Sequence, residues 1–259
     1  MTVTSPPTVH VRTEDGVATV LLDRPPLNVL TIAMLNELES ALRDLGAVPD
    51  LRLIVIRGAG RVFSAGVDVG EHVGDALEPM LDAFARVSRR LLETPVPTLA
   101  VIHGAALGGA CEIAAVCDLA VTTDDAKLGT PEIALGVVPP VGAAMFPLLV
   151  GPQRARALVL LGEPVRGTEA AAIGLVWKSV APDALDGEVT RIVERFRSLS
   201  GASLRLAKRT FRVAELARTP VEAVMAADAE QRRSLPRMHD ANEGLRAFLE
   251  KRAPRWLHR

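Results

Sequence analysis

The sequence has few cysteines, no tyrosine and almost no net charge. Its 259 residues include two cysteines and carry a formal net charge of −1. A nearly neutral chain gives no reason to expect nucleic-acid binding. Cys111 and Cys117 are six residues apart on one predicted helix and point in different directions. This spacing argues against a disulfide and fits a reducing compartment.

Long apolar runs and targeting segments are also missing. No uncharged apolar run reaches the length that crosses a bilayer. Residues 1–7 have neither the basic region nor the apolar core of a signal peptide. We therefore expect a soluble, cytoplasmic protein with no membrane partner. Hydrophobic residues make up 49% of the chain and charged residues 24%, which are ordinary values for a globular domain.

The order of predicted elements indicates an α/β core followed by helices. Strands and helices alternate through the first ~150 residues, which favours a layered α/β fold. The expected strands are 9–11, 17–22, 51–56, 98–102 and 118–122, and the expected helices are 31–46, 78–92, 110–116, 154–161, 168–173, 185–199, 203–216, 220–233 and 242–251. With no repeat or linker, we expect one domain, formed by a core over 1–195 and a helical region over 196–259.

The stretch 105–115 contains an unusual buried carboxylate. A small and apolar segment, Ala110–Val116, is interrupted only by Glu112. A helix that is apolar all round is a buried helix, so it carries this carboxylate into the interior. Gly109 lies where the helix begins, and its free N–H group favours negative charge. A carboxylate and an N–H donor around one point suit acyl chemistry that passes through an oxyanion.

Five segments resemble the crotonase (enoyl-CoA hydratase/isomerase) superfamily. They are 24–30, 63–69, 104–118, 129–136 and 243–252, in the family's order and spacing. The resemblance implies a fold of repeated ββα turns, with a C-terminal helical region that forms homotrimers, often paired as homohexamers. It also implies an acyl-CoA thioester substrate, with no metal and no cofactor apart from the coenzyme A of the substrate.

The resemblance also assigns roles to individual residues. Backbone N–H groups of Val67 and Gly109 would form the oxyanion hole around the thioester carbonyl. Glu112 and Glu132 match the two catalytic glutamates of the hydratase branch. The residues implied to bind coenzyme A or substrate are Leu27, Val29, Ala65, Asp68, Val69, Gly108, Pro139 and Pro140.

The paired glutamates favour hydration of an α,β double bond. This reaction needs a base for water and a proton for the α-carbon, and two carboxyls in an apolar pocket can divide these roles. We expect them to titrate as a coupled pair. Two alternatives remain open: an enoyl-CoA isomerase on the same scaffold, which uses one glutamate as a proton shuttle, and a non-catalytic acyl-CoA-binding subunit.

The sequence departs from common hydratases after Glu132. Pro140 stands where the family usually has glycine, so a water-positioning N–H group is lost. Together with residues 25–30 and 63–72, this change resembles the subgroup that hydrates cyclic dienoyl-CoA esters. The expected substrate is therefore a cyclic or bulky ester.

Several candidate residues also have plain structural interpretations. Glu112 and Glu132 could be a structural acid and a surface loop acid, and the glycines before Glu112 could serve only close packing. Asp68 could brace its own loop. His72 could be a solvated residue at a helix end rather than one that faces substrate. Cys111 has no basic partner in the sequence that would activate a thiolate, so we expect it to serve packing.

Overall fold

The computed structural model describes residues 6–259. Most of the N-terminal segment for which we predict no signal peptide lies outside the described residues. Among the described residues, no helix combines the length and the apolar character needed to cross a membrane.

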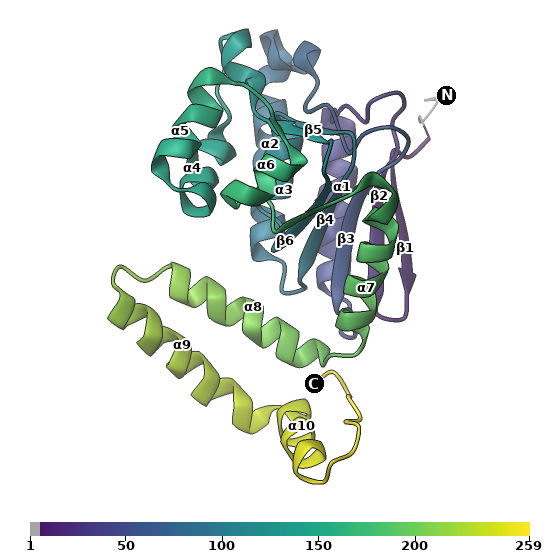
Figure 1. The fold of residues 1–259 in the computed structure, drawn as a ribbon, viewed down its shortest axis with the longest axis vertical. Helices are drawn as coiled ribbons and strands as arrows, with labels where there is room; N and C mark the ends of the chain where they lie inside the picture. Colours follow the sequence, from purple (N-terminus) through teal and green to yellow (C-terminus); the bar gives the residue numbers. More distant parts are fainter. Residues whose placement is uncertain (1–5) are drawn as a thin grey trace.

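A six-stranded sheet forms the centre of the molecule (Figure 1). Its strand order is β1-β2-β3-β4-β6-β9, in which β1 and β2 form an antiparallel hairpin and all other neighbours are parallel. The predicted hairpin and the three predicted apolar strands are confirmed. The strands are β1 (Val9–Glu14), β2 (Val17–Leu22), β3 (Leu53–Gly58), β4 (Thr98–Ile102), β6 (Leu119–Thr123) and β9 (Lys178–Val180).

A second, three-stranded sheet was not predicted. It consists of β5 (Ala105–Leu107), β7 (Lys127–Gly129) and β8 (Val165–Arg166), in the order β5-β7-β8. Strands of two or three residues are too short to show an alternating pattern in the sequence. This sheet fixes the path of the chain between β4 and the helix that carries Glu112.

Helices cover both faces of the main sheet. On one face, α1 (Ile32–Gly46), α2 (Leu77–Glu93) and α3 (Gly109–Ala115) enclose the larger apolar core. On the other face, α7 (Leu185–Arg197) packs over a smaller core that includes Leu53, Val101 and Val121 (Figure 1). Thr31 caps α1 as predicted, because its side chain accepts a hydrogen bond from the Met34 N–H.

The region between β7 and β9 contains three helices, one of which the sequence did not predict. They are α4 (Pro140–Val150), α5 (Pro152–Leu161) and α6 (Gly167–Ile173). The unpredicted helix is α4, which begins at the second of two consecutive prolines. Proline is accepted at the first position of a helix because the N–H that it lacks would have no partner there. Helix α4 therefore begins in the segment where the sequence departs from common hydratases.

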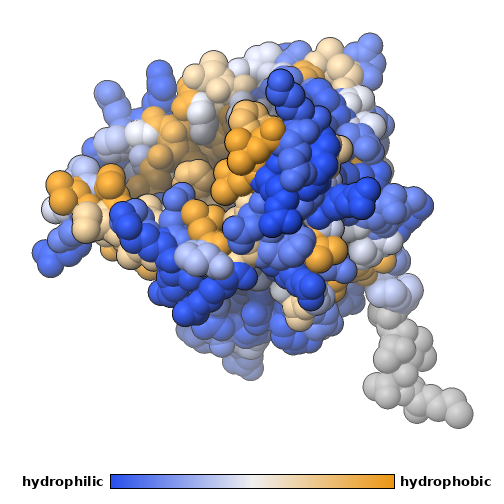
Figure 2. All heavy atoms as spheres, turned by 90° about the horizontal axis from the view of Figure 1, so that it is seen from below, coloured by the Kyte–Doolittle hydropathy of each residue, from blue (hydrophilic) through white to orange (hydrophobic). Residues whose placement is uncertain are grey.

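The C-terminal helices form an arm beside the core (Figure 1). The arm consists of α8 (Gly201–Glu215), α9 (Pro220–Ser234) and α10 (His239–Leu249). Helix α7 continues to Arg197, so the predicted division after residue 195 falls within α7. The functional separation of the two regions stays a prediction. Seen from the end that carries the arm, apolar side chains gather around a hollow in the surface (Figure 2).

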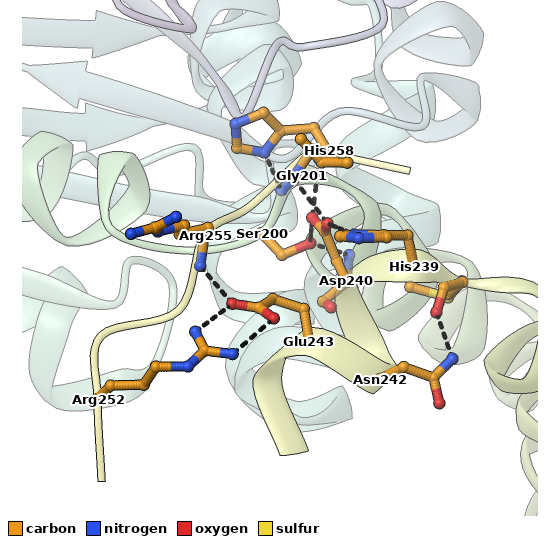
Figure 3. A network of polar contacts seen from close by, with 12 residues as sticks. Ser200, Gly201, His239, Asp240, Asn242, Glu243, Arg252, Arg255 and His258 are labelled. Carbon is orange, nitrogen blue, oxygen red and sulfur yellow. Dashed lines mark hydrogen bonds and ion pairs between the residues drawn. The ribbon is translucent and has the colours of Figure 1, made fainter. Parts of the chain in front are cut away.

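The C-terminal tail is joined to α8 and α10 by a network around Asp240 (Figure 3). The Asp240 carboxylate is 1% exposed and accepts hydrogen bonds from the Ser200 hydroxyl and from the backbone N–H groups of Leu257 and His258. His258 Nδ1 in turn accepts a hydrogen bond from the Gly201 N–H at 3.1 Å, at the first residue of α8. One buried carboxylate thus connects the start of the arm, its last helix and the tail.

Candidate active site

Gly108 shapes the turn from β5 into α3. The backbone of Gly108 has a positive φ of 55°, and its N–H donates to the Gly129 carbonyl at 2.8 Å. A Cβ atom on Gly108 would lie 2.7 Å from Glu132 Oε1. Residue 108 must therefore lack a side chain if Glu132 is to lie beside the turn.

Glu112 is a buried carboxylate on α3, as predicted. Its side chain is 2% exposed, and every other residue of the helix is buried as well. Glu112 Oε1 accepts a hydrogen bond of 2.7 Å from the N–H of Gly142, in the first turn of α4. Burial raises the pKa of Glu112 to about 7, helped by repulsion from Glu132 and opposed by the Gly142 hydrogen bond. This carboxyl is therefore able both to give and to accept a proton near neutral pH.

Glu132 lies in the 3₁₀ turn Pro131–Leu135. Its Oε2 atom is buried and has no hydrogen-bond partner among the described residues. Burial raises the pKa of this carboxyl, and its own backbone N–H and the His72 side chain oppose the rise. A buried carboxylate oxygen without a partner needs one from outside the chain, such as water or a ligand.

The two glutamates line one cavity of about 250 Å³. The structure thereby brings together four predicted site residues, Val67, Glu112, Glu132 and Pro140. Apart from the glutamates and His72, the lining is apolar and consists of Val67, Leu77, Met80, Leu81, Phe84, Val137, Val138 and Pro140. Two carboxyls in a small apolar cavity are suited to proton transfer, because low polarity and mutual repulsion separate their protonation states.

The predicted N–H donors, Val67 and Gly109, are neighbours in space. Gly109 is the first residue of α3, and a Cβ atom there would lie 2.9 Å from Val67 Cγ1 and 2.9 Å from Phe84 Cε2. Among the described residues, neither the Val67 N–H nor the Gly109 N–H donates to another backbone group. Both N–H groups are left for an external acceptor, at the edge of the cavity that Val67 lines.

Other predicted binding residues lie outside the lining of this cavity. Leu27, Val29, Ala65, Asp68 and Val69 belong to two loops that run side by side, joined by a hydrogen bond from the Ala65 N–H to the Leu27 carbonyl at 2.9 Å. Asp68 Oδ1 accepts a hydrogen bond from the Gly70 N–H at 2.8 Å, so its side chain braces its own loop. Contact of these loops with coenzyme A stays a prediction.

Pro139 immediately precedes the first residue of α4 and is also outside the cavity lining. Cys111 is buried beside Glu112, and desolvation raises the pKa of its thiol to about 12. The thiol is therefore neutral near pH 7, which agrees with a packing role. Both cysteines are free.

The sequence did not identify the wall that α2 gives to the cavity. Leu77, Met80, Leu81 and Phe84 follow a helical spacing, which is the signal that they share one face. That pattern indicates a face turned toward the protein interior, but not that part of it borders an empty volume. Val137 and Val138, which also line the cavity, lie in the segment after Glu132 that departs from common hydratases.

A second, larger cleft of about 820 Å³ lies between the β1–β3 edge of the main sheet and the start of α7. Its charged lining mixes both signs, and Arg57 pairs with Asp186 across it at 3.3 Å. It contains neither glutamate of the buried pair. The chemistry of the buried carboxyls therefore belongs to the smaller cavity.

Comparisons with known proteins agree with this geometry. A sequence model of the family described as enoyl-CoA hydratase/isomerase matches residues 12–259. A probable enoyl-CoA hydratase of Mycobacterium leprae is 34% identical, over 97% of this chain and 98% of its own. The cyclohexa-1,5-dienecarbonyl-CoA hydratase of Thauera aromatica is also 34% identical, over 98% of each chain.

Solved structures share the fold over almost the full length. The enoyl-CoA hydratase of Mycobacterium smegmatis superimposes with a TM-score of 0.91 at 31% identity, covering 97% of this chain and 99% of the other. The human enoyl-CoA hydratase domain-containing protein 3 gives a TM-score of 0.91 at 30% identity, covering 96% and 100%. The expected crotonase fold is confirmed, and the chain belongs to the enoyl-CoA hydratase/isomerase family.

Proposed function

We propose that this protein is an enoyl-CoA hydratase, which adds water across the α,β double bond of an acyl-CoA thioester. The observation that carries the proposal is the meeting of Glu112 and Glu132 in one apolar cavity. Addition of water needs a group that takes a proton from water and another that gives a proton to carbon. The pKa of Glu112 is raised to about 7 and that of Glu132 is raised as well, which supports a pair whose carboxyls divide the roles of acid and base.

The proposed reaction balances with these two groups. The water oxygen forms a bond to the β-carbon, and the electron pair of the double bond moves toward the α-carbon and the thioester oxygen. One carboxylate accepts a water proton, and the other carboxyl gives its proton to the α-carbon. The pair then exchanges roles, so that the next water finds a base again.

The negative charge on the thioester oxygen needs a donor. We assign this role to the backbone N–H groups of Val67 and Gly109, which have no backbone partner among the described residues. Each such donor is worth about 3 kcal/mol of transition-state stabilisation in other enzymes. The loops with Leu27, Val29, Ala65, Asp68 and Val69 would hold the coenzyme A part, beside Gly108 and Pro139.

The proposed acyl group is cyclic or bulky. Val137, Val138 and Pro140 give the cavity an apolar wall, and Pro140 starts a helix, which makes that wall rigid. A rigid wall suits a bulky group better than a short flexible chain. The similarity to the Thauera relative fits this substrate class. The mycobacterial relative of equal identity has the broader name of probable enoyl-CoA hydratase. Kinetics with linear and cyclic esters therefore test the proposed acyl group.

A labelling experiment distinguishes hydration from isomerisation and from binding without catalysis. Purified protein is incubated with linear and cyclic enoyl-CoA esters in ¹⁸O-labelled water, and the products are weighed by mass spectrometry. Hydration places ¹⁸O in the product, whereas double-bond isomerisation moves the double bond without label. A non-catalytic acyl-CoA-binding subunit leaves every ester unchanged. Either of the last two results would contradict the proposed function.

We also propose that the arm assembles the protein into a homotrimer or a homohexamer. Large apolar side chains on α8 and α9 are exposed in the single chain, among them Phe211 at 69% and Val221 at 73%. Apolar surface of this kind is normally covered by another subunit. Sedimentation at micromolar concentration tests the proposal, and a monomer would contradict it.

A further inference from the structure

His72 is the third polar residue of the cavity, and the proposed reaction does not yet use it. It ends the 3₁₀ turn Val69–His72, and its Nδ1 atom lies 3.1 Å from the carbonyl oxygen of Asp68. A carbonyl oxygen only accepts hydrogen bonds, so Nδ1 must carry the proton in this contact. The other ring nitrogen, Nε2, is then an acceptor in the neutral imidazole.

The position of His72 relates it to the glutamate pair. It lines the same cavity as Glu112 and Glu132, among side chains that are otherwise apolar. Among the described residues, the hydrogen-bond contact of the His72 ring is with the Asp68 carbonyl, and Glu132 Oε2 has no partner. The cavity of about 250 Å³ that His72 and Glu132 both line has room for a small polar molecule.

At the start of α4, residues 140 and 142 have no free N–H group to offer a water molecule. Pro140 lines the cavity and has no N–H group, and the N–H of Gly142 is already bound to Glu112. A water that attacks carbon must be held by several polar contacts so that its lone pair points at the substrate. Within the described lining, the polar side chains for this task are those of the two glutamates and His72.

We propose that His72 positions the reacting water, by accepting one of its hydrogens at Nε2 while a carboxylate of the Glu112–Glu132 pair accepts the other. This inference rests on the proposed function. The water oxygen bonds to the β-carbon, the carboxylate takes the proton that it binds, and the hydrogen held by Nε2 stays on the new hydroxyl group. His72 remains neutral and gives up no proton.

Two amide substitutions separate the two nitrogens of the ring. The amide of asparagine takes the place of Nδ1, so His72→Asn keeps the contact with the Asp68 carbonyl and removes the acceptor in the cavity. The amide of glutamine takes the place of Nε2, so His72→Gln keeps a polar acceptor in the cavity and loses the contact with Asp68. Steady-state kinetics with the ester that wild type hydrates fastest are measured for all three proteins, together with their thermal unfolding.

We expect His72→Asn to lower kcat by about tenfold to a hundredfold with little change in KM, the size of effect that misplacement of a reacting group causes. We expect His72→Gln to keep kcat within about threefold of wild type. The reverse order, full activity in both variants or equal losses in both would overturn the proposal. If wild type hydrates no ester, the proposed function has failed and the inference fails with it. If wild type is a hydratase and His72→Asn leaves its kcat unchanged, only the inference about His72 is wrong.

Discussion

The carboxylate of Glu132 occupies the space where residue 108 would have a side chain. A Cβ atom on Gly108 would come within 2.7 Å of Glu132 Oε1. Because residue 108 is glycine and has no Cβ atom, the turn before α3 can pack against the 3₁₀ turn after β7. This fit places Glu132 at the same cavity as Glu112, on which the proposed hydration depends.

Replacing either glutamate by its amide should abolish most of the hydration activity. Glu112→Gln and Glu132→Gln should each lower kcat by a factor on the order of 10² or more, because an amide cannot carry the proton. Binding of a coenzyme A ester, measured by calorimetry, should be largely kept. Glu37→Gln is a matched control, since that carboxylate binds the Thr8 N–H away from the cavity. Near-wild-type turnover in either variant would remove that glutamate from the mechanism.

Gly109 offers a test of the backbone donor. Gly109→Pro deletes the N–H group at the first position of α3, where proline is otherwise accepted. We expect turnover to vanish while a coenzyme A product still binds weakly. Gly109→Ala is the control, because it adds the crowding against Val67 and Phe84 but keeps the N–H. Circular dichroism checks the fold, and a folded, active Gly109→Pro protein would refute the oxyanion assignment.

Glu112 should make the wild-type protein less stable as pH rises. Its pKa is raised from 4.5 to about 7 in the folded state, so folding takes up a proton between these values. Stability therefore falls as pH increases through this window. We expect Glu112→Gln to be more stable than wild type at pH 8, by a free energy of unfolding on the order of 3 kcal/mol. Urea unfolding measures this difference. It should disappear near pH 4, and a constant difference from pH 4 to 8 would contradict the assignment.

Pro140 should determine which esters are hydrated well. We expect a low kcat/KM for crotonyl-CoA relative to a cyclic or branched unsaturated ester. Pro140→Gly should narrow that gap, because it restores an N–H group and some freedom of the wall. Pro152→Gly is the control, since Pro152 also begins a helix but does not line the cavity. If the kcat/KM of wild type is higher for crotonyl-CoA by about tenfold, or 1.4 kcal/mol, the proposed cyclic substrate class is wrong.

The network around Asp240 should stabilise the arm. Burial by itself would raise the pKa of Asp240, but hydrogen bonds from Ser200, Leu257, His239 and His258 lower it below its usual value. Asp240→Asn should reduce the free energy of unfolding by about 2 kcal/mol at pH 7. Asp228→Asn, at an exposed ion pair with Arg232, should change it little.

The sign of the pH dependence follows from the lowered pKa of Asp240. The stabilisation is present above the ordinary aspartate pKa of about 3.9 and is lost as pH falls below it. The difference between wild type and Asp240→Asn, measured by urea unfolding at one protein concentration, should therefore shrink in acid. A difference that grows in acid would refute the proposed role of the carboxylate.

The sequence predicted the parts of the site that depend on one local pattern. Helix α3 could be predicted with its buried Glu112 because small apolar residues surround a single carboxylate. The α2 wall could not, because an amphipathic pattern does not distinguish a packed face from one that borders a cavity. Helix α4 was not predicted because two consecutive prolines are typical of a loop. The hydrogen bond from its first turn to Glu112 depends on the position of α3, which the sequence of this segment does not show. The contact between Gly108 and Glu132 depends on β5 and β7, which are too short to be seen in the sequence.

The hydrogen bond between Gly142 and Glu112 has a consequence for the pH at which the site works. A single amide hydrogen serves both the first turn of α4 and the acidity of a carboxyl on α3. Mutations that shift the first turn of α4 alter the strength of that acid without replacing it. The working pH of the site can therefore be tuned from helix α4 while the glutamate itself stays the same.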